Sequence, residues 1–324
     1  MIEVTILSGF LGAGKTTLLR HGLGGVADPA TAVIVNEFGE VGLDDRLVRI
    51  VAEDPMLIAG GCVCCAKRPD LVRALSALLD DRDSGGRPLE RVVLECSGLA
   101  DPAPIAFTIA ADPMLRHHFT VTSTVVAVDA VNGAAQLAAQ PECAKQVHVA
   151  DELVITKVDL ADPERVQALA AALHAANPAA ALRIAVNGHV APEPPAVPAQ
   201  VLPTPAGDMT DRPVHAGDVA SLTIARQQPL DWMAFSVWLS MLLHARGEDV
   251  LRVKGVIGLP GGDAVSVNGV QHIVHPPEHV PADVAAGPRA TRLVVIARGV
   301  APELIERSFD AFLALAPHAR AVAA

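Results

Sequence analysis

The chain contains no tyrosine, and aromatic residues make up only 3% of its 324 positions. Proteins that bind single-stranded nucleic acid stack bases on aromatic side chains, so this scarcity argues against such a surface. Basic residues are also few, with 25 Lys and Arg against 36 Asp and Glu, which gives a net charge of −11. Because phosphate backbones are bound by basic faces, we expect no nucleic-acid partner.

Long apolar runs are absent as well, and none approaches the roughly 18 residues that a membrane span requires. The N-terminus lacks the basic start and the long apolar stretch of a signal peptide. We therefore expect no membrane partner and a cytoplasmic location. The five cysteines do not read as a disulfide framework in a reducing compartment, and three of them lie within four residues. That cluster raises the question of a metal or redox role.

The first half of the chain alternates apolar, β-branched runs with helical patterns. The runs typical of strands cover 2–9, 31–38, 91–98, 122–131 and 151–160, and helical patterns cover 15–23, 69–81, 133–150 and 163–176. A continuous apolar run is typical of a strand that is buried on both faces. This alternation predicts an α/β domain over residues 1–187, with a doubly wound, mostly parallel sheet.

A Pro-rich stretch over 188–217 interrupts this pattern. It contains seven prolines and no periodicity, which is typical of an extended linker. Short apolar runs and two helical patterns, at 230–247 and about 302–315, then predict a smaller α+β domain over 218–324 with an antiparallel sheet. Trp232, Phe235 and Trp238 share one face of the first of these helices, so we expect them in its core.

The segment GFLGAGKT (9–16) matches the pattern G-x-x-x-x-G-K-[ST] without a mismatch, between a strand and a helix. Such a loop turns tightly at its glycines and directs backbone N–H groups at phosphate oxygens. The helix N-terminus adds the positive end of its dipole. We therefore predict a P-loop NTPase whose nucleotide is held by Gly9, Gly12, Ala13, Gly14, Lys15, Thr16 and Thr17.

Individual roles follow from the chemistry of these side chains. Lys15 is expected to reach the β- and γ-phosphates and to assist catalysis, and Thr16 to ligate Mg²⁺. Glu95 ends the apolar run RVVLE, where a second carboxylate can hold Mg²⁺ through water or orient the attacking water. Gly98 would let the backbone approach the γ-phosphate, and Cys96 is expected to be buried at the strand end.

The segment TKVD (156–159) follows a further apolar run. Asp159 can accept hydrogen bonds from N1 and N2 of guanine, donors that adenine lacks, and Lys157 would pack over the base. Downstream of a phosphate loop, this segment favours GTP over ATP. We therefore add Thr156, Lys157, Asp159 and Gly98 to the predicted nucleotide site.

The segment GGCVCC (60–65) places three thiols, Cys62, Cys64 and Cys65, after a pair of glycines. Adjacent cysteines bridge only with strain, so a disulfide among them is disfavoured. Three interpretations remain: a transition-metal site, a redox relay, or small apolar residues of a core. The flanking glycines favour an exposed loop and hence the metal site.

Three ligands from one loop leave a tetrahedral ion one position short. Water, a partner's thiol or a carboxylate could complete it, and Glu37 and Glu40 in VNEFGEVGLDD (35–45) are candidates. An open position suits transfer better than permanent holding, because structural zinc sites are closed.

Taken together, these segments resemble the CobW-like family of metallochaperone GTPases, relatives of the urease and hydrogenase maturation GTPases. The matching stretches are GFLGAGKTTLL, VNEFGEVGLDD, GGCVCC, ECSGLADP, VVAVDA, ADELVITKVDL and RVKGVI. The resemblance implies a P-loop GTPase domain followed by a smaller α+β domain. It also implies GTP/GDP, Mg²⁺ and Zn²⁺ or Co²⁺ as ligands, with slow GTP hydrolysis coupled to metal delivery to a client metalloprotein.

Two other functions remain compatible with the sequence. One is a small-molecule kinase or ATPase that uses the same phosphate loop, and the other is a metal-buffering protein with a regulatory GTP site. The client's identity and the choice between monomer and homodimer are left open by the sequence.

Overall fold

The computed structural model describes residues 1–21, 29–35, 56–57, 68–191, 219–280 and 290–314. The chain divides into two compact units, one formed by 1–174 with 180–201 and the other by 175–179 with 202–324. Among the described residues, no helix has both the length and the apolar character needed to cross a bilayer.

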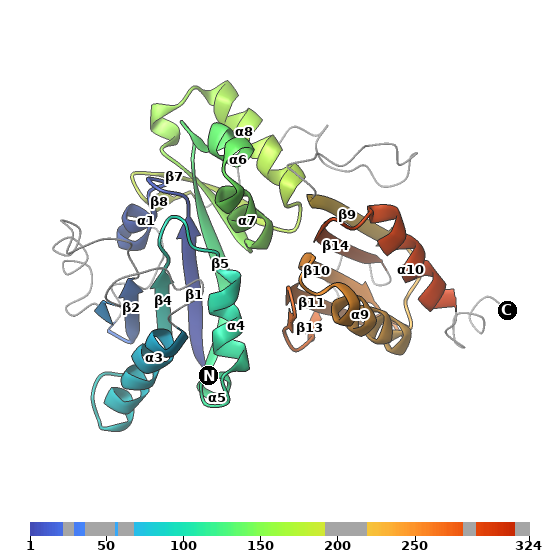
Figure 1. Cartoon of the computed structure of the whole chain (residues 1–324), viewed down its shortest axis with the longest axis horizontal. Coiled ribbons are helices and arrows are strands. Elements are labelled where there is room, and N and C mark those ends of the chain that lie inside the picture. The colour runs from blue at the N-terminus through green and yellow to red at the C-terminus, as the bar shows by residue number, and fades with distance from the viewer. Residues whose placement is uncertain (22–28, 36–55, 58–67, 192–218, 281–289, 315–324) are drawn as a thin grey trace. The chain divides into compact units, whose positions relative to one another are not determined.

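The first unit is built on an eight-stranded sheet in the order β3-β2-β4-β1-β5-β6-β7-β8. Its strands β2, β4, β1 and β5 lie side by side in Figure 1. All neighbours pair in parallel except β7 and β8, which are antiparallel. The strands are β1 (Ile2–Gly9), β2 (Thr31–Val35), β3 (Met56–Leu57), β4 (Arg91–Glu95), β5 (Phe119–Asp129), β6 (Glu152–Thr156), β7 (Ala181–Val186) and β8 (His189–Val190). The predicted α/β class is confirmed.

Among the described residues, helices lie in most of the connections between parallel strands, because parallel pairing requires a crossover. They are α1 (Lys15–His21), α3 (Arg68–Asp83), α4 (Ala103–Ala111), α5 (Leu115–His118), α6 (Gly133–Ala139), α7 (Pro141–Val149) and α8 (Pro163–Ala176), with a 3₁₀ turn η1 (Val158–Leu160) after β6. The phosphate-loop helix α1 packs on a core formed by Leu7, Leu18, Leu19, Val93 and Val154 with their neighbours.

The connections change direction across the sheet beside β1, because earlier strands are added on one side of β1 and later strands on the other. The chain passes from β1 over β4 to β2, and later from β4 over β1 to β5. In open parallel sheets, ligands bind at the carboxyl ends of the strands beside such a reversal. The phosphate loop begins at this point, because β1 ends at Gly9.

Several elements differ from the sequence predictions. The strand expected over 91–98 ends at Glu95, and the helix expected over 133–150 is two helices separated at Gln140, because Pro141 cannot donate the backbone hydrogen bond that a continuous helix needs. Helix α4 was not predicted. Strand β8 lies within the stretch expected to be an extended linker, and it pairs with β7 through Val186 and His189.

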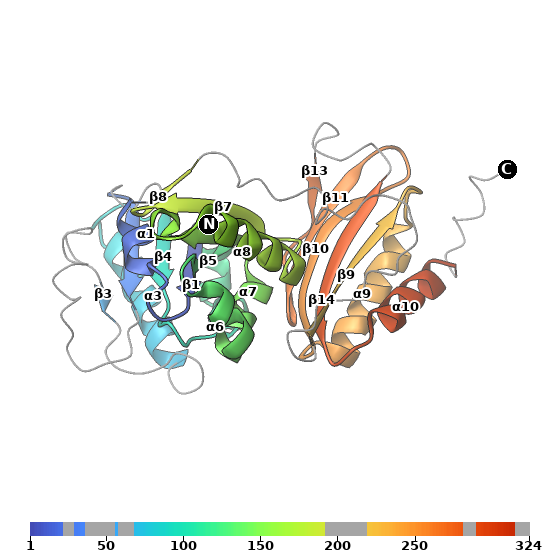
Figure 2. The same cartoon turned by 90° about the horizontal axis from the view of Figure 1, so that it is seen from above.

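The second unit is an antiparallel sheet in the order β12-β11-β10-β14-β9, with β13 paired to β11. Its strands are β9 (Val219–Arg226), β10 (Val250–Gly258), β11 (Ala264–Val270), β12 (Ile273–Val274), β13 (Glu278–Val280) and β14 (Thr291–Arg298). Helices α9 (Trp232–Arg246) and α10 (Pro302–Ala314) lie side by side on one face of this sheet (Figures 1 and 2). The predicted α+β class is confirmed.

Aromatic packing joins the two helices of this unit. Trp238 and Phe309 meet edge to face with ring centroids 4.9 Å apart, and the Trp238 indole N–H donates to Ser308 Oγ at 3.0 Å. Phe235 and Trp238 are buried in this core, and Trp232 packs against it while partly buried. The predicted core position is therefore confirmed for Phe235 and Trp238, whereas Trp232 lies at the edge of the core.

Candidate functional site: a phosphate loop at the carboxyl edge

The backbone of the phosphate loop requires glycine at several positions. Gly12 and Gly14 have φ of 74° and 87°, in the left-handed region that favours glycine. Gly9 has φ of 142°, and a Cβ there would lie 2.5 Å from the Ala127 carbonyl oxygen of β5. The loop can therefore turn directly from β1 into α1 only with the glycines that the motif supplies.

Thr16 and Glu95 meet across this loop. The Thr16 hydroxyl donates to Glu95 Oε1 at 2.9 Å, although 79 residues separate them in the chain. Glu95 is 2% exposed at the end of β4, next to β1 in the sheet. The structure thus brings together Thr16, the predicted Mg²⁺ ligand, and Glu95, the carboxylate predicted either to hold Mg²⁺ through water or to orient the attacking water. A hydroxyl and a carboxylate are ligands that suit this hard cation.

Lys15 begins α1 beside these donors. Its ammonium donates to the carbonyl oxygens of Gly9 and Phe10, at 2.9 and 3.3 Å, so it lies over the loop that it was predicted to serve. Thr17, which is also predicted to hold the nucleotide, is exposed.

The segment after Glu95 packs directly on the phosphate loop. A Cβ at Gly98 would lie 2.6 Å from Leu11 Cδ2 and 2.7 Å from the Leu11 nitrogen, so only glycine fits. Gln146 of α7 is fully buried, and its amide donates to the carbonyl oxygens of Gly98 and Ala100 at 3.1 and 2.9 Å. Gln146 therefore positions this segment, a role that the sequence analysis did not detect.

The TKVD segment is tied to the same loop by Thr156. The Thr156 hydroxyl donates to the Ala13 carbonyl at 2.7 Å and also contacts the Val128 carbonyl at 3.3 Å. Its side chain is buried, so it connects β6 to the phosphate loop. Asp159 lies in η1 and is exposed.

Lys157, the next residue, forms an ion pair with Asp129 at the end of β5, with Nζ 2.8 Å from Oδ2. Burial by itself would raise the pKa of the Asp129 carboxyl. The hydrogen bonds from Lys157, the Val131 N–H and Asn132 outweigh burial and lower that pKa. Asp129 was not among the predicted site residues, although it falls in the quoted stretch VVAVDA.

Helix α7 also buries two side chains that can titrate, Cys143 and His148. Burial raises the pKa of the Cys143 thiol to about 11 and lowers the pKa of the His148 imidazole to about 4. Cys96 is buried at the strand end, as predicted. A high pKa leaves a thiol protonated and unreactive, so Cys143 does not resemble a redox cysteine.

The predicted transition-metal ligands lie outside the described residues. These are Cys62, Cys64, Cys65, Glu37 and Glu40. Within the part of the chain that the structure describes, no group of three or more His, Cys, Asp or Glu side chains could hold a metal ion. The metal site therefore stays a prediction from the sequence.

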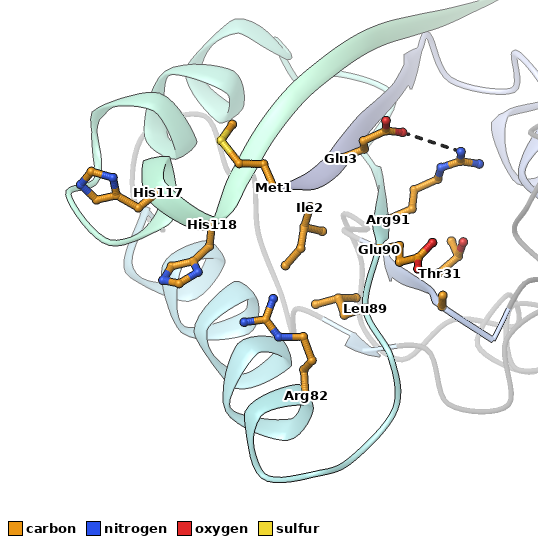
Figure 3. Close-up of a pocket in the computed structure, with 11 residues that line it drawn as sticks. Met1, Ile2, Glu3, Thr31, Arg82, Leu89, Glu90, Arg91, His117 and His118 are labelled. Carbon is orange, nitrogen blue, oxygen red and sulfur yellow. Dashed lines mark ion pairs between the residues drawn. The ribbon is translucent and has the colours of Figure 1, made fainter.

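A cavity of about 550 Å³ lies at the amino ends of the strands, where β1 and β4 begin. In Figure 3, Arg82 and His118 approach it from one side, and the Glu3–Arg91 ion pair lies on the other. Arg82 also pairs with Asp83, with 2.7 Å between Nη2 and Oδ1. Because the phosphate loop and Glu95 lie at the carboxyl ends, this cavity is separate from the predicted nucleotide site.

Two protein-family models match this chain, one in its N-terminal part and one in its C-terminal part. Residues 3–183 match the nucleotide-binding domain of the CobW/HypB/UreG family, and residues 219–313 match the C-terminal domain of the cobalamin synthesis protein CobW. This chain belongs to the CobW/HypB/UreG family. The resemblance drawn from the motifs is thereby confirmed.

Two relatives of this CobW-family chain are named zinc chaperones. The zinc chaperone YjiA of Escherichia coli is 33% identical over 285 residues, which cover 84% of this chain and 87% of that protein. The zinc chaperone CobW of Pseudomonas aeruginosa is 37% identical over 151 residues, 44% of this chain and 39% of that protein.

A solved structure has the same architecture. The crystal structure of Zn(II)-bound YjiA GTPase from E. coli matches with a TM-score of 0.65 and 28% identity, covering 96% of this chain and 98% of that one. The P-loop domain followed by a separate antiparallel-sheet domain is therefore the fold of this CobW-family protein.

Proposed function

We propose that this chain is a GTP-binding metallochaperone that hydrolyses GTP slowly, binds Zn²⁺ or Co²⁺ through its Cys-x-Cys-Cys loop, and delivers the ion to a client metalloprotein. The observation that carries the nucleotide part is the Thr16–Glu95 hydrogen bond of 2.9 Å beside Lys15. Membership of a nucleotide-binding family and two relatives named zinc chaperones support the rest.

In this proposal, the loop N–H groups and Lys15 bind the phosphates, and Thr16 with Glu95 holds Mg²⁺. When bound, Mg²⁺ neutralises charge on the β- and γ-phosphates. Glu95 also orients the attacking water, and Lys157 and Asp159 select guanine. A phosphate-loop GTPase without further help turns over at roughly 10⁻⁴ to 10⁻² s⁻¹, so we expect slow hydrolysis.

The thiol loop lies in sequence between the phosphate loop and the Glu95 strand. GTP is expected to order the segment 36–45 and to bring Cys62, Cys64 and Cys65 together, with Glu37 or Glu40 as a further ligand. Hydrolysis removes the γ-phosphate contacts and releases the ion. Metal affinity then depends on the nucleotide, and nucleotide affinity depends equally on the metal.

The deciding experiment measures Zn²⁺ and Co²⁺ affinity of the full chain by chelator competition, with a non-hydrolysable GTP analogue and with GDP. We expect tighter binding with the GTP analogue, and loss of this difference when Cys62, Cys64 and Cys65 are replaced by Ser. Equal affinities with the two nucleotides would contradict the coupling. Metal release that is unaffected by Lys15→Ala would instead indicate a metal buffer.

Nucleotide competition tests the enzyme class. We expect GTP and GDP to displace a fluorescent guanine nucleotide far better than ATP and ADP do. A preference for ATP, or transfer of phosphate to a third substrate, would favour the kinase or ATPase.

A further inference from the structure

The conformation of Lys157 is unusual for a residue with a side chain. Its φ is 56° and its ψ is 33°, in the left-handed region that non-glycine residues seldom occupy. Such a backbone persists only where the surroundings hold it. Two contacts do so: the Ala130 N–H donates to the Thr156 carbonyl at 2.9 Å, and the Lys157 ammonium pairs with Asp129 at 2.8 Å.

Asp129 is a buried carboxylate whose two oxygens are both bound. It is 1% exposed, and Oδ1 accepts from the backbone N–H groups of Val131 and Asn132 at 2.7 and 3.3 Å. Oδ2 accepts from Lys157 Nζ at 2.8 Å and from Asn132 Nδ2 at 3.2 Å. The carboxylate is thus fixed by its own loop, and it can serve as a rigid anchor for the lysine.

The turn that carries Asp159 follows directly from Lys157. The Leu160 N–H donates to the Lys157 carbonyl at 3.0 Å, which closes the 3₁₀ turn η1 and leaves Asp159 exposed. The direction of this turn depends on the left-handed backbone at Lys157. The ion pair between Lys157 and Asp129 therefore affects the position of the Asp159 side chain.

We propose that Asp129 is a specificity-positioning residue: its carboxylate holds Lys157 and the following turn so that Asp159 meets the guanine edge. This inference rests on the proposed guanine-nucleotide function and deepens it, because base selectivity is assigned to a side chain that does not touch the base. Lys15, Thr16 and Glu95, which are proposed to hold the phosphates and Mg²⁺, lie on other elements, so we expect the effect of Asp129 to fall mainly on the base.

Asp129→Asn tests this role, because asparagine keeps the shape and one acceptor oxygen but removes the charge that pairs with Lys157. In the full chain with Mg²⁺, displacement of a fluorescent GDP analogue gives the affinities for GDP, ADP and tripolyphosphate. We expect the GDP affinity to fall at least tenfold and the GDP-to-ADP preference to collapse, with tripolyphosphate affinity within about twofold of the unchanged protein.

Asp151→Asn is the matched control. Asp151 also binds a backbone group of this sheet, accepting from the Thr124 N–H at 3.0 Å, but at the amino end of β6. We expect it to leave base preference unchanged. An equal loss of all three ligands in Asp129→Asn, or an unaltered GDP preference, would overturn the positioning role.

A double-mutant cycle with Lys157→Met shows whether Asp129 acts through the lysine. If it does, the double variant loses no more GDP affinity than Lys157→Met alone, whereas additive losses contradict the proposal. If Asp129→Asn does not fold, Lys157→Met tests the same proposal. We then expect Lys157→Met to lose the preference for GDP over ADP and to keep its affinity for tripolyphosphate. If the unchanged protein lacks a guanine preference, the proposed GTP function fails as well.

Discussion

Thr16 and Thr156 connect the phosphate loop to the strand ends on either side of β1. Thr16 binds Glu95 of β4, and Thr156 binds the Ala13 carbonyl from β6. The two hydroxyls have different expected roles, because Thr16 is a predicted Mg²⁺ ligand and Thr156 holds the loop backbone in place. Replacing either residue therefore has a distinct consequence, although both contacts are single hydrogen bonds.

Glu95→Gln separates the charge of this side chain from its shape. The amide oxygen can still accept from Thr16, but it binds Mg²⁺ weakly and cannot act as a base, a role that typically contributes at least about 100-fold in rate. We expect GTP turnover to fall about 100-fold and GDP affinity to change less than about threefold, measured by phosphate release and nucleotide titration.

Glu90→Gln is the control for that measurement, because Glu90 is an exposed glutamate that directly precedes β4, at its amino end. It is expected to leave turnover unchanged. Turnover that survives Glu95→Gln would show that another residue orients the water.

His148 makes stability depend on pH. Burial lowers the pKa of its imidazole to about 4, whereas an unfolded histidine has a pKa of about 6.5. The stabilisation is therefore complete above pH 6.5 and is lost as the pH falls from 6.5 towards 4. Between pH 7 and pH 5 we expect the free energy of unfolding to fall by roughly 2 kcal/mol from this group.

Denaturant titrations at several pH values measure this slope. His148→Leu is expected to flatten it, and His117→Leu, at an exposed histidine, is expected to leave it unchanged. A His148→Leu variant with the same slope as the parent would assign the pH dependence to other groups.

At the residue scale, spacing in the sequence was enough to predict Lys15, Thr16 and Glu95 as neighbours, because the motif and the strand end fix their places. Asp129 and Gln146 were not predicted. A strand-end aspartate is common, and nothing in the local pattern of α7 shows that Gln146 faces a loop 46 residues earlier. Contacts set by tertiary packing leave no periodic trace in the chain.

At the scale of elements, α7 acts as a support for the segment that follows β4. Gln146→Leu keeps the side-chain volume but removes the amide that binds the carbonyl oxygens of Gly98 and Ala100. Leaving buried carbonyl groups without a partner destabilises a protein by about 1–3 kcal/mol. We expect that loss, together with weaker discrimination between a GTP analogue and GDP, because Gly98 is the predicted γ-phosphate contact.

Gln167→Leu, at an exposed glutamine of α8, is the matched control for both readouts. Lower stability with unchanged discrimination would limit Gln146 to a structural role.

Helices and strands were predicted correctly where the local pattern of apolar residues, prolines and glycines sets their bounds. The prediction failed where tertiary contacts set where an element ends or whether it forms. The run 91–98 looks like one strand, but β4 ends at Glu95 because the next residues must turn so that Gly98 meets Leu11. Strand β8 is too short for an alternating pattern, and it exists through its pairing with β7.

At the scale of the whole molecule, each unit has a hydrophobic core of its own. Gly255→Ala tests the second core, because a Cβ at Gly255 would lie 2.1 Å from the Arg292 carbonyl oxygen on β14. The Arg292 backbone can make room only if the strands move apart, so we expect the free energy of unfolding of the second unit to fall by about 3 kcal/mol or more.

Differential scanning calorimetry with and without GDP and Mg²⁺ assigns the transitions. We expect the nucleotide to raise the unfolding temperature of the first unit and Gly255→Ala to lower that of the second, with exposed Ser240→Ala neutral. A stability unchanged by Gly255→Ala would contradict the close strand contact.

The non-local strand pairings of β1 also govern the order of events in folding. Glu3 pairs with Arg91 and Ile2 with Phe119, so the strands that pair with β1 are synthesised long after β1 itself. Closing such long loops is slow, because chain entropy is lost before the contacts form. Because Gly9 of the phosphate loop pairs with Ala127 of β5, we expect the loop to reach its final shape only once β5 has joined β1. A nucleotide that recognises the finished loop consequently slows unfolding and leaves the folding rate unchanged.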